Sequence, residues 1–154
     1  MSKTVTSILV VLGVAFGLIF WGNRQSANQT GDQDITGMCV QHQSISMHIH
    51  PHLKIVIKGQ EQPIPADIGI TLGCMRPIHT HDATGTLHLE FPNVRDVRLA
   101  EFFSIWGKQF SSNQIFDFQN GPEGQVKMLV NGQENMEFEN YIMKDLDQIE
   151  IIYE

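Results

Sequence analysis

Motifs of several enzyme classes are missing from this chain of 154 residues. It has no G-x-S-x-G, no H-E-x-x-H and no glycine-rich loop that would cradle a phosphate. Positive charge is also scarce, because 10 Lys and Arg are set against 17 Asp and Glu and the formal net charge is −7. This balance argues against nucleic acid or anionic lipid as a partner.

Cysteine is limited to two residues, Cys39 and Cys74. In an exported domain such a pair can close one disulfide, and either sulfur could instead act as a thiolate ligand for a metal. We favour pairing, because an exposed free thiol is a liability in an oxidising compartment.

Charge is absent from residues 5–22, which are nearly all apolar or small. As a helix this stretch would span roughly 27 Å, about the thickness of a hydrocarbon core. It ends in Phe20 and Trp21 and is followed by neither an A-x-A site nor a lipidation cysteine. The pattern predicts a retained single-pass anchor in residues 1–22 of a cell-membrane protein. A cleaved signal peptide is the alternative, and both export the rest of the chain.

The segment after the anchor, residues 23–37, is polar and rich in Gly, Ser, Asn and Gln. Such a composition is typical of a flexible linker rather than a packed element. We therefore expect one extracytoplasmic domain in residues 38–154, which is long enough to bury a single core.

Alternating apolar and polar residues predict several β-strands in this domain. In residues 47–58 (MHIHPHLKIVIK) one phase is mainly apolar, and the other carries His48, His50 and His52 with two lysines. Pro51 cannot donate a backbone hydrogen bond, so we expect an edge strand or a bulge at this position.

Residues 77–91 are predicted to form a hairpin whose four-residue turn ends in Gly85. Pairing across that turn places His79 opposite His88, and the alternation directs Glu90 away from the core. Two further strands are expected at residues 126–130 and 148–153.

Residues 99–110 predict an amphipathic helix with one apolar stripe, formed by Leu99, Phe102, Phe103, Trp106 and Phe110. Combined with the strands, it predicts an α+β fold, mainly antiparallel β with one amphipathic helix. We expect a β-grasp-like arrangement, preceded by the N-terminal transmembrane helix.

Histidine is concentrated in one part of the chain. Six of the seven histidines lie on the polar phase of the predicted strands, namely His48, His50, His52, His79, His81 and His88. Residues i, i+2 and i+4 of a strand share a face, so these imidazoles are expected to converge. Neutral imidazole binds Zn, Cu, Fe and Ni, and a site requires only three or four nitrogens. The pattern predicts a metal site, although any one of these histidines alone would suit a solvated surface.

Two carboxylates lie close to the histidines in the sequence. Asp82 and Glu90 are placed to orient a ligand ring through its Nδ1–H, and Asp82 could instead cap the turn. Softer ligands near the cluster, Met47, Cys74 and Met75, favour copper over zinc as the bound ion.

Several separated motifs occur here in one order: HPHL at 50–53, IPADIGI at 64–70, IHTHDATG at 78–85, LHLE at 87–90 and FFSIWG at 102–107. Residues 47–153 resemble membrane-anchored proteins of archaea and environmental bacteria that share these motifs. The resemblance implies one recurring domain and carries no assigned activity.

Three functions are compatible with these features. The favoured one is a membrane-anchored protein that captures, buffers or delivers copper or zinc, with another membrane protein as a further partner. A small metalloenzyme is the alternative, with an open coordination position and Glu90 or Asp82 as general base. The third is an interaction domain whose histidines respond to pH without tight metal binding.

Overall fold

The computed structural model describes residue 35, residues 37–40 and residues 44–154. These residues belong to one compact unit that extends from Asp34 to Glu154. The predicted anchor at residues 1–22, and all of the predicted linker apart from residues 35 and 37, lie outside the described residues.

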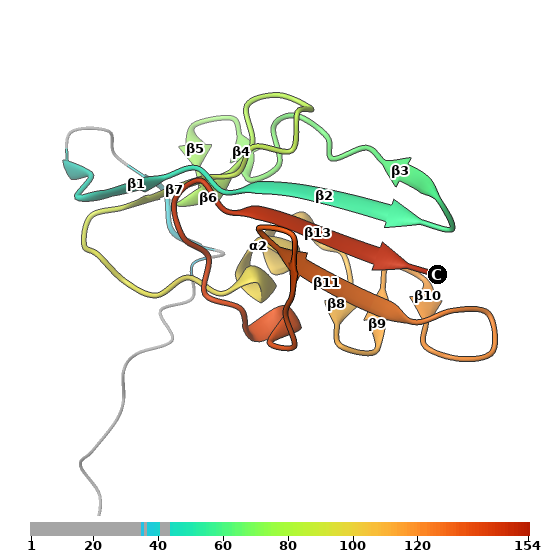
Figure 1. Ribbon diagram of the computed structural model, residues 1–154. Coiled ribbons are helices and arrows are strands. Elements are labelled where there is room, and N and C mark those ends of the chain that lie inside the picture. Colours follow the sequence, from blue (N-terminus) through green and yellow to red (C-terminus); the bar gives the residue numbers. More distant parts are fainter. Residues whose placement is uncertain (1–34, 36, 41–43) are drawn as a thin grey trace, which may run out of the picture. The chain divides into compact units, whose positions relative to one another are not determined.

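The domain is built on a five-stranded sheet with the order β12-β11-β13-β2-β3. The strands β13 and β2 pair in parallel, and the other neighbours are antiparallel. Figure 1 shows β2, β13 and β11 as long strands lying side by side. Their bounds are β2 (His52–Ile57), β3 (Gln60–Gln62), β11 (Val126–Val130), β12 (Gln133–Glu134) and β13 (Gln148–Tyr153).

One face of this sheet forms the core, because apolar residues alternate along its central strands. On β2, Leu53, Ile55 and Ile57 are buried, and the residues between them are half-buried. The helix α2 (Leu99–Trp106) contributes Leu99, Phe102 and Phe103 to the same core. Gly107 ends the helix in a left-handed conformation, so the predicted helix at 99–110 is too long at its end.

A second sheet has the order β1-β7-β6 and is antiparallel throughout. It consists of β1 (Met47–Ile49), β7 (His88–Phe91) and β6 (Ile78–His79). The predicted strand at 47–58 is thus divided at His50 and Pro51, so that β1 joins this sheet and β2 joins the larger one. Pro51 lacks the N–H that a continuous ladder would use, and its carbonyl accepts the Leu87 N–H at 2.9 Å.

Shorter elements complete the domain. A disulfide joins Cys39 to Cys74 across 35 positions and ties the chain ahead of β1 to β5. The remaining elements are β4 (Ile70–Thr71), β5 (Cys74–Met75), β8 (Phe110–Ser111), β9 (Gln114–Ile115), β10 (Phe118–Gln119) and the 3₁₀ helix η2 (Phe138–Asn140).

The predicted fold class, an α+β domain preceded by a transmembrane helix, is wrong for the described part of the chain. That part is mostly β-sheet with one α-helix, which spans 8 residues because Gly107 stops it. Among the described residues no helix is long and apolar enough to cross a membrane.

Gly85 packs closely against the backbone of Leu53 on β2. Its φ is +89°, Leu53 N–H donates to its carbonyl at 2.9 Å, and an added Cβ would overlap the Leu53 carbonyl oxygen. We expect Gly85→Ala to lower the free energy of unfolding by more than about 2 kcal/mol, measured by urea denaturation.

Gly59→Ala is the matched control for this prediction. Gly59 also has a positive φ, +77°, but an added Cβ there would meet nothing within 4 Å. Its cost should be about 1 kcal/mol, from backbone strain alone. Equal losses in the two variants would show that the approach to Leu53 is unimportant.

Candidate metal centre

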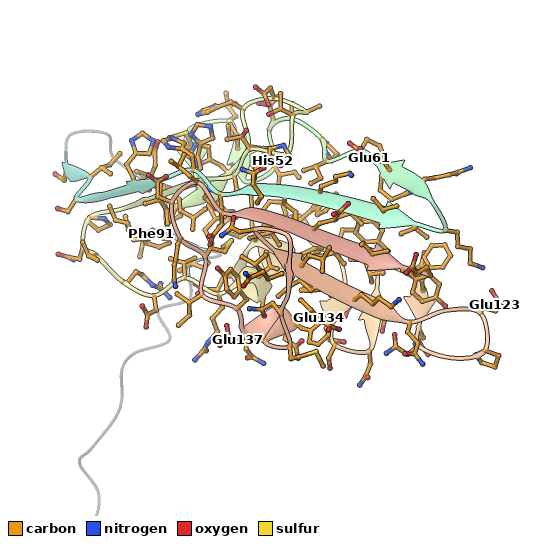
Figure 2. The ribbon with its side chains drawn as sticks, in the orientation of Figure 1. His52, Glu61, Phe91, Glu123, Glu134 and Glu137 are labelled. Carbon is orange, nitrogen blue, oxygen red and sulfur yellow. A yellow bond between two sulfur atoms is a disulfide. The ribbon has the colours of Figure 1, made fainter. Side chains whose placement is uncertain are left out.

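The central strand of the smaller sheet brings histidines from three strands together. His88 begins β7, and β7 is flanked by β1 on one side and β6 on the other. The predicted pairing of His79 with His88 is confirmed. Figure 2 shows imidazole rings gathered beside β1, apart from the labelled His52.

Two groups of three histidines could each hold a metal ion. We call His48, His50 and His88 the β1 triad, and His79, His81 and His88 the β6 triad. Within each triad the ligand atoms all lie within 4.8 Å of one another. The structure thus converges five of the six predicted ligands, and His88 belongs to both triads.

The closest nitrogens have the spacing of metal ligands. The Nε2 atoms of His48 and His50 are 3.1 Å apart, and those of His79 and His81 are 3.2 Å apart. A tetrahedral ion with bonds of 2.0–2.1 Å places its ligands about 3.3 Å from one another. Without an ion the same distances suit an N–H···N hydrogen bond, so each pair is preformed at nearly the separation that an ion requires.

His79 is oriented by the backbone. Its side chain is buried, and its Nδ1–H donates to the Arg76 carbonyl at 2.9 Å. This bond leaves the Nε2 lone pair directed at His81, as in metal-bound histidines whose second nitrogen bonds a carbonyl. Burial lowers the pKa of His79 to about 4, against the opposing effect of the Arg76 carbonyl. The ring is therefore neutral and able to bind a metal at pH 7.

This lowered pKa predicts a pH-dependent stability of the metal-free protein. In the unfolded chain His79 takes up a proton near pH 6.5, whereas in the folded protein it does so only near pH 4. Stability should therefore fall as pH drops from 6.5 to 4, by at most about 1.4 kcal/mol per pH unit from this residue. Urea denaturation at pH 7 and pH 5 measures the loss. In His79→Gln the loss should shrink, and an unchanged loss would assign it to other groups.

The β1 triad is more open to solvent. The side chain of His48 is 49% exposed and that of His50 is 36% exposed. The backbone N–H of His50 donates to Asp145 Oδ1 at 2.8 Å, and its Nδ1 lies 3.9 Å from the same oxygen. Asp145 thus fixes the backbone of His50, whose ring Nε2 lies 3.1 Å from that of His48. An ion can enter the cluster from this side.

Glu90 is buried rather than directed to solvent as predicted. It faces His48 across the β1–β7 pair, and its Oε1 lies 3.0 Å from His48 Nε2. The carboxylate therefore lies beside the nitrogen that faces His50, not behind a ring at Nδ1. It places a negative charge next to the β1 triad, which favours a bound cation.

His88 has an unusual environment for a histidine ring. Its Nδ1 is buried and has no hydrogen-bond partner among the described residues. Burial, followed by the neighbouring His81 and His50, lowers the pKa of His88. A buried, neutral and unsatisfied ring nitrogen is costly in a folded protein unless something binds to it.

His52 and Asp82 do not take the predicted positions. His52 lies on β2, beyond the division at Pro51, and its Nε2 lies 2.8 Å from the Thr84 carbonyl. Asp82 Oδ1 accepts hydrogen bonds from Thr84 N–H at 2.9 Å and Thr84 Oγ1 at 2.6 Å, and these bonds lower the pKa of Asp82. Both residues fix the turn, and neither belongs to a triad.

Two orienting groups were not predicted. The Arg76 carbonyl is a backbone atom and leaves no signal in a sequence. Asp145 is 95 positions from His50 and reaches it because β13 runs parallel to β2, with Gln148 opposite His52. Cys74, considered as a soft ligand, is held in the disulfide.

No protein-family model, no curated protein and no solved structure matches this chain.

Proposed function

We propose that this protein binds a transition-metal ion through its histidine cluster and captures, buffers or delivers that ion outside the cytoplasm. The observation that carries the proposal is the convergence of five imidazoles from β1, β6, β7 and the residues that follow β1 and β6, with two Nε2 pairs 3.1 and 3.2 Å apart. The Arg76 carbonyl fixes the ring of His79 and Asp145 fixes the backbone of His50, which supports a built site over freely solvated histidines.

We propose copper ahead of zinc. Among the divalent ions of the first transition row, copper(II) binds nitrogen ligands most tightly. Two of the three soft ligands predicted nearby give no further support, because Cys74 is in the disulfide and Met47 is buried in the apolar core. Zinc also binds sets of three histidines, so the experiment includes both ions.

The proposal is for binding rather than catalysis. The chain lacks the nucleophile motifs of the common hydrolases. A hollow of about 230 Å³ is lined by Met38, Cys39, Val40, Ser44 and Pro92, none of which belongs to a triad. The disulfide suits an oxidising compartment, which supports a location outside the cytoplasm.

The metal content of the untagged full chain tests this proposal. The chain is purified from cells grown with added copper or zinc, dialysed against a mild chelator and measured by mass spectrometry of the metals. We expect close to stoichiometric or higher metal in the wild type. A variant with glutamine at the five triad histidines should retain almost none.

The matched control is His52→Gln, which changes a histidine outside both triads and should retain the wild-type metal. Circular dichroism establishes that each variant is folded. Metal that the chelator strips completely from the wild type would contradict the proposal and favour an interaction domain that responds to pH.

A further inference from the structure

We propose that the cluster holds two metal ions at once, one in each triad, bridged by the imidazole ring of His88. This inference rests on the proposed function, because it specifies how many ions the same histidines bind and how they are connected. In this arrangement His88 is a ligand to both ions, through Nδ1 to one and through Nε2 to the other.

The five rings do not form a single set around one point. The ligand atoms fall into two groups of three, and no larger group forms among the described residues. The ring contacts show the same two groups. The rings of His48 and His50 contact the ring of His88, and so do the rings of His79 and His81. Among the described residues no ring of the first pair contacts a ring of the second pair. An ion with bonds near 2.1 Å needs ligands within about 4.2 Å of each other, so one ion cannot collect all five.

His88 lies between the two pairs because of the strand order. The β1 side provides His48 and His50, the β6 side provides His79 and His81, and β7 runs between them. The His88 ring lies with its centroid 4.8 Å from that of His50 and 4.6 Å from that of His81. The ring centroids of His48 and His79 lie farther from His88, at 6.2 and 5.3 Å, so His88 is close to one ring of each pair.

The ring nitrogens of His88 are available to both ions. The Nδ1 atom is buried with no hydrogen-bond partner in the described structure, and each triad includes one ligand atom of this ring. An imidazole carries its two nitrogens on different edges, and two ions bound to them are about 6 Å apart.

Binding of the second ion requires one proton to leave. A neutral imidazole has one lone pair and one N–H, so the first ion takes the lone pair. The second ion displaces the remaining ring proton to solvent and leaves a singly negative bridging imidazolate. The Glu90 carboxylate beside His48 and the Asp145 carboxylate beside His50 offset part of the added positive charge.

Copper(II) titration of the metal-free full chain, followed by electron paramagnetic resonance, tests the bridge. Binding should saturate at two ions per chain. The integrated signal should rise up to one equivalent and then fall, because two copper(II) ions joined by an imidazolate couple their spins. The coupled pair should form with release of one proton more than two separate sites would give.

Two double variants serve as matched controls. His48→Gln with His50→Gln leaves the β6 triad intact, and His79→Gln with His81→Gln leaves the β1 triad intact. Each should bind one copper(II) with an uncoupled signal, and circular dichroism should show a wild-type fold.

The outcomes separate the two proposals. Saturation at one copper(II) per chain would overturn the two-ion inference and leave the proposed function standing. Two ions with independent signals would overturn the bridge. Absence of any chelator-resistant copper or zinc would overturn the proposed function and this inference together.

Discussion

Replacing His88 with alanine should weaken the binding of copper(II) or zinc(II) by more than ~100-fold. Orienting groups outside a metal's ligand set change affinity by about 10- to 100-fold, so loss of a shared ligand should exceed that range. His88 is the only described histidine that belongs to both triads, so the variant leaves two isolated pairs. Competition with a chromogenic chelator at pH 7.5 measures the change.

The control for this prediction is His52→Ala. This residue has the same chemistry but lies on β2 in the larger sheet, and its Nε2 lies against the Thr84 carbonyl. Its loss should change metal affinity by less than ~10-fold, the lower end of the effect of groups that only orient ligands. If His88→Ala and His52→Ala bind with equal affinity, the triads are not the site.

Replacing Cys39 and Cys74 together with alanine should lower the free energy of unfolding by about 4 kcal/mol. The disulfide closes a loop of 35 positions, and opening it restores conformational freedom to the unfolded chain. The double variant avoids leaving one unpaired thiol. Urea denaturation of the metal-free protein measures the loss.

The same disulfide offers a control on the site. Wild-type protein treated with a reductant should lose the same free energy of unfolding as the double variant. Untreated protein, whose disulfide is intact, should keep its stability. Metal affinity should change little, because the triads depend on β1, β7 and β6. Stability that is unaffected by reduction would contradict this assignment.

Local pattern was enough to predict the strands that hold the core. The segments at 126–130 and 148–153 are confirmed as β11 and β13, because apolar residues recur at every second position and give each strand one buried face. The pairing of His79 with His88 is confirmed, but the predicted four-residue turn is too short, because β6 ends at His79, β7 begins at His88 and residues 80–87 join them.

Long-range pairing was not predictable from local pattern. The parallel contact of β13 with β2 joins segments about a hundred positions apart, and it brings Asp145 to His50. At Pro51 the sequence predicted an edge strand or a bulge, and not a division into two strands. This division separates His52 from His48 and His50, because β1 and β2 enter different sheets.

The burial of Glu90 shows a further limit. Alternation placed it on the polar face of its strand, but that face is itself covered where the histidines converge. A sequence pattern distinguishes the two faces of a strand and does not say what packs on each. The candidate site was therefore predictable as a set of histidines and not as a geometry.

X-ray absorption of the metal-loaded, untagged chain tests the central claim most directly. We expect the bound metal ion to have a first shell of nitrogen and oxygen at about 2.0 Å, with the outer-shell scattering typical of imidazole and no sulfur ligand. A sulfur ligand, or a shell without imidazole scattering, would contradict a site built from the histidines of β1, β7 and β6.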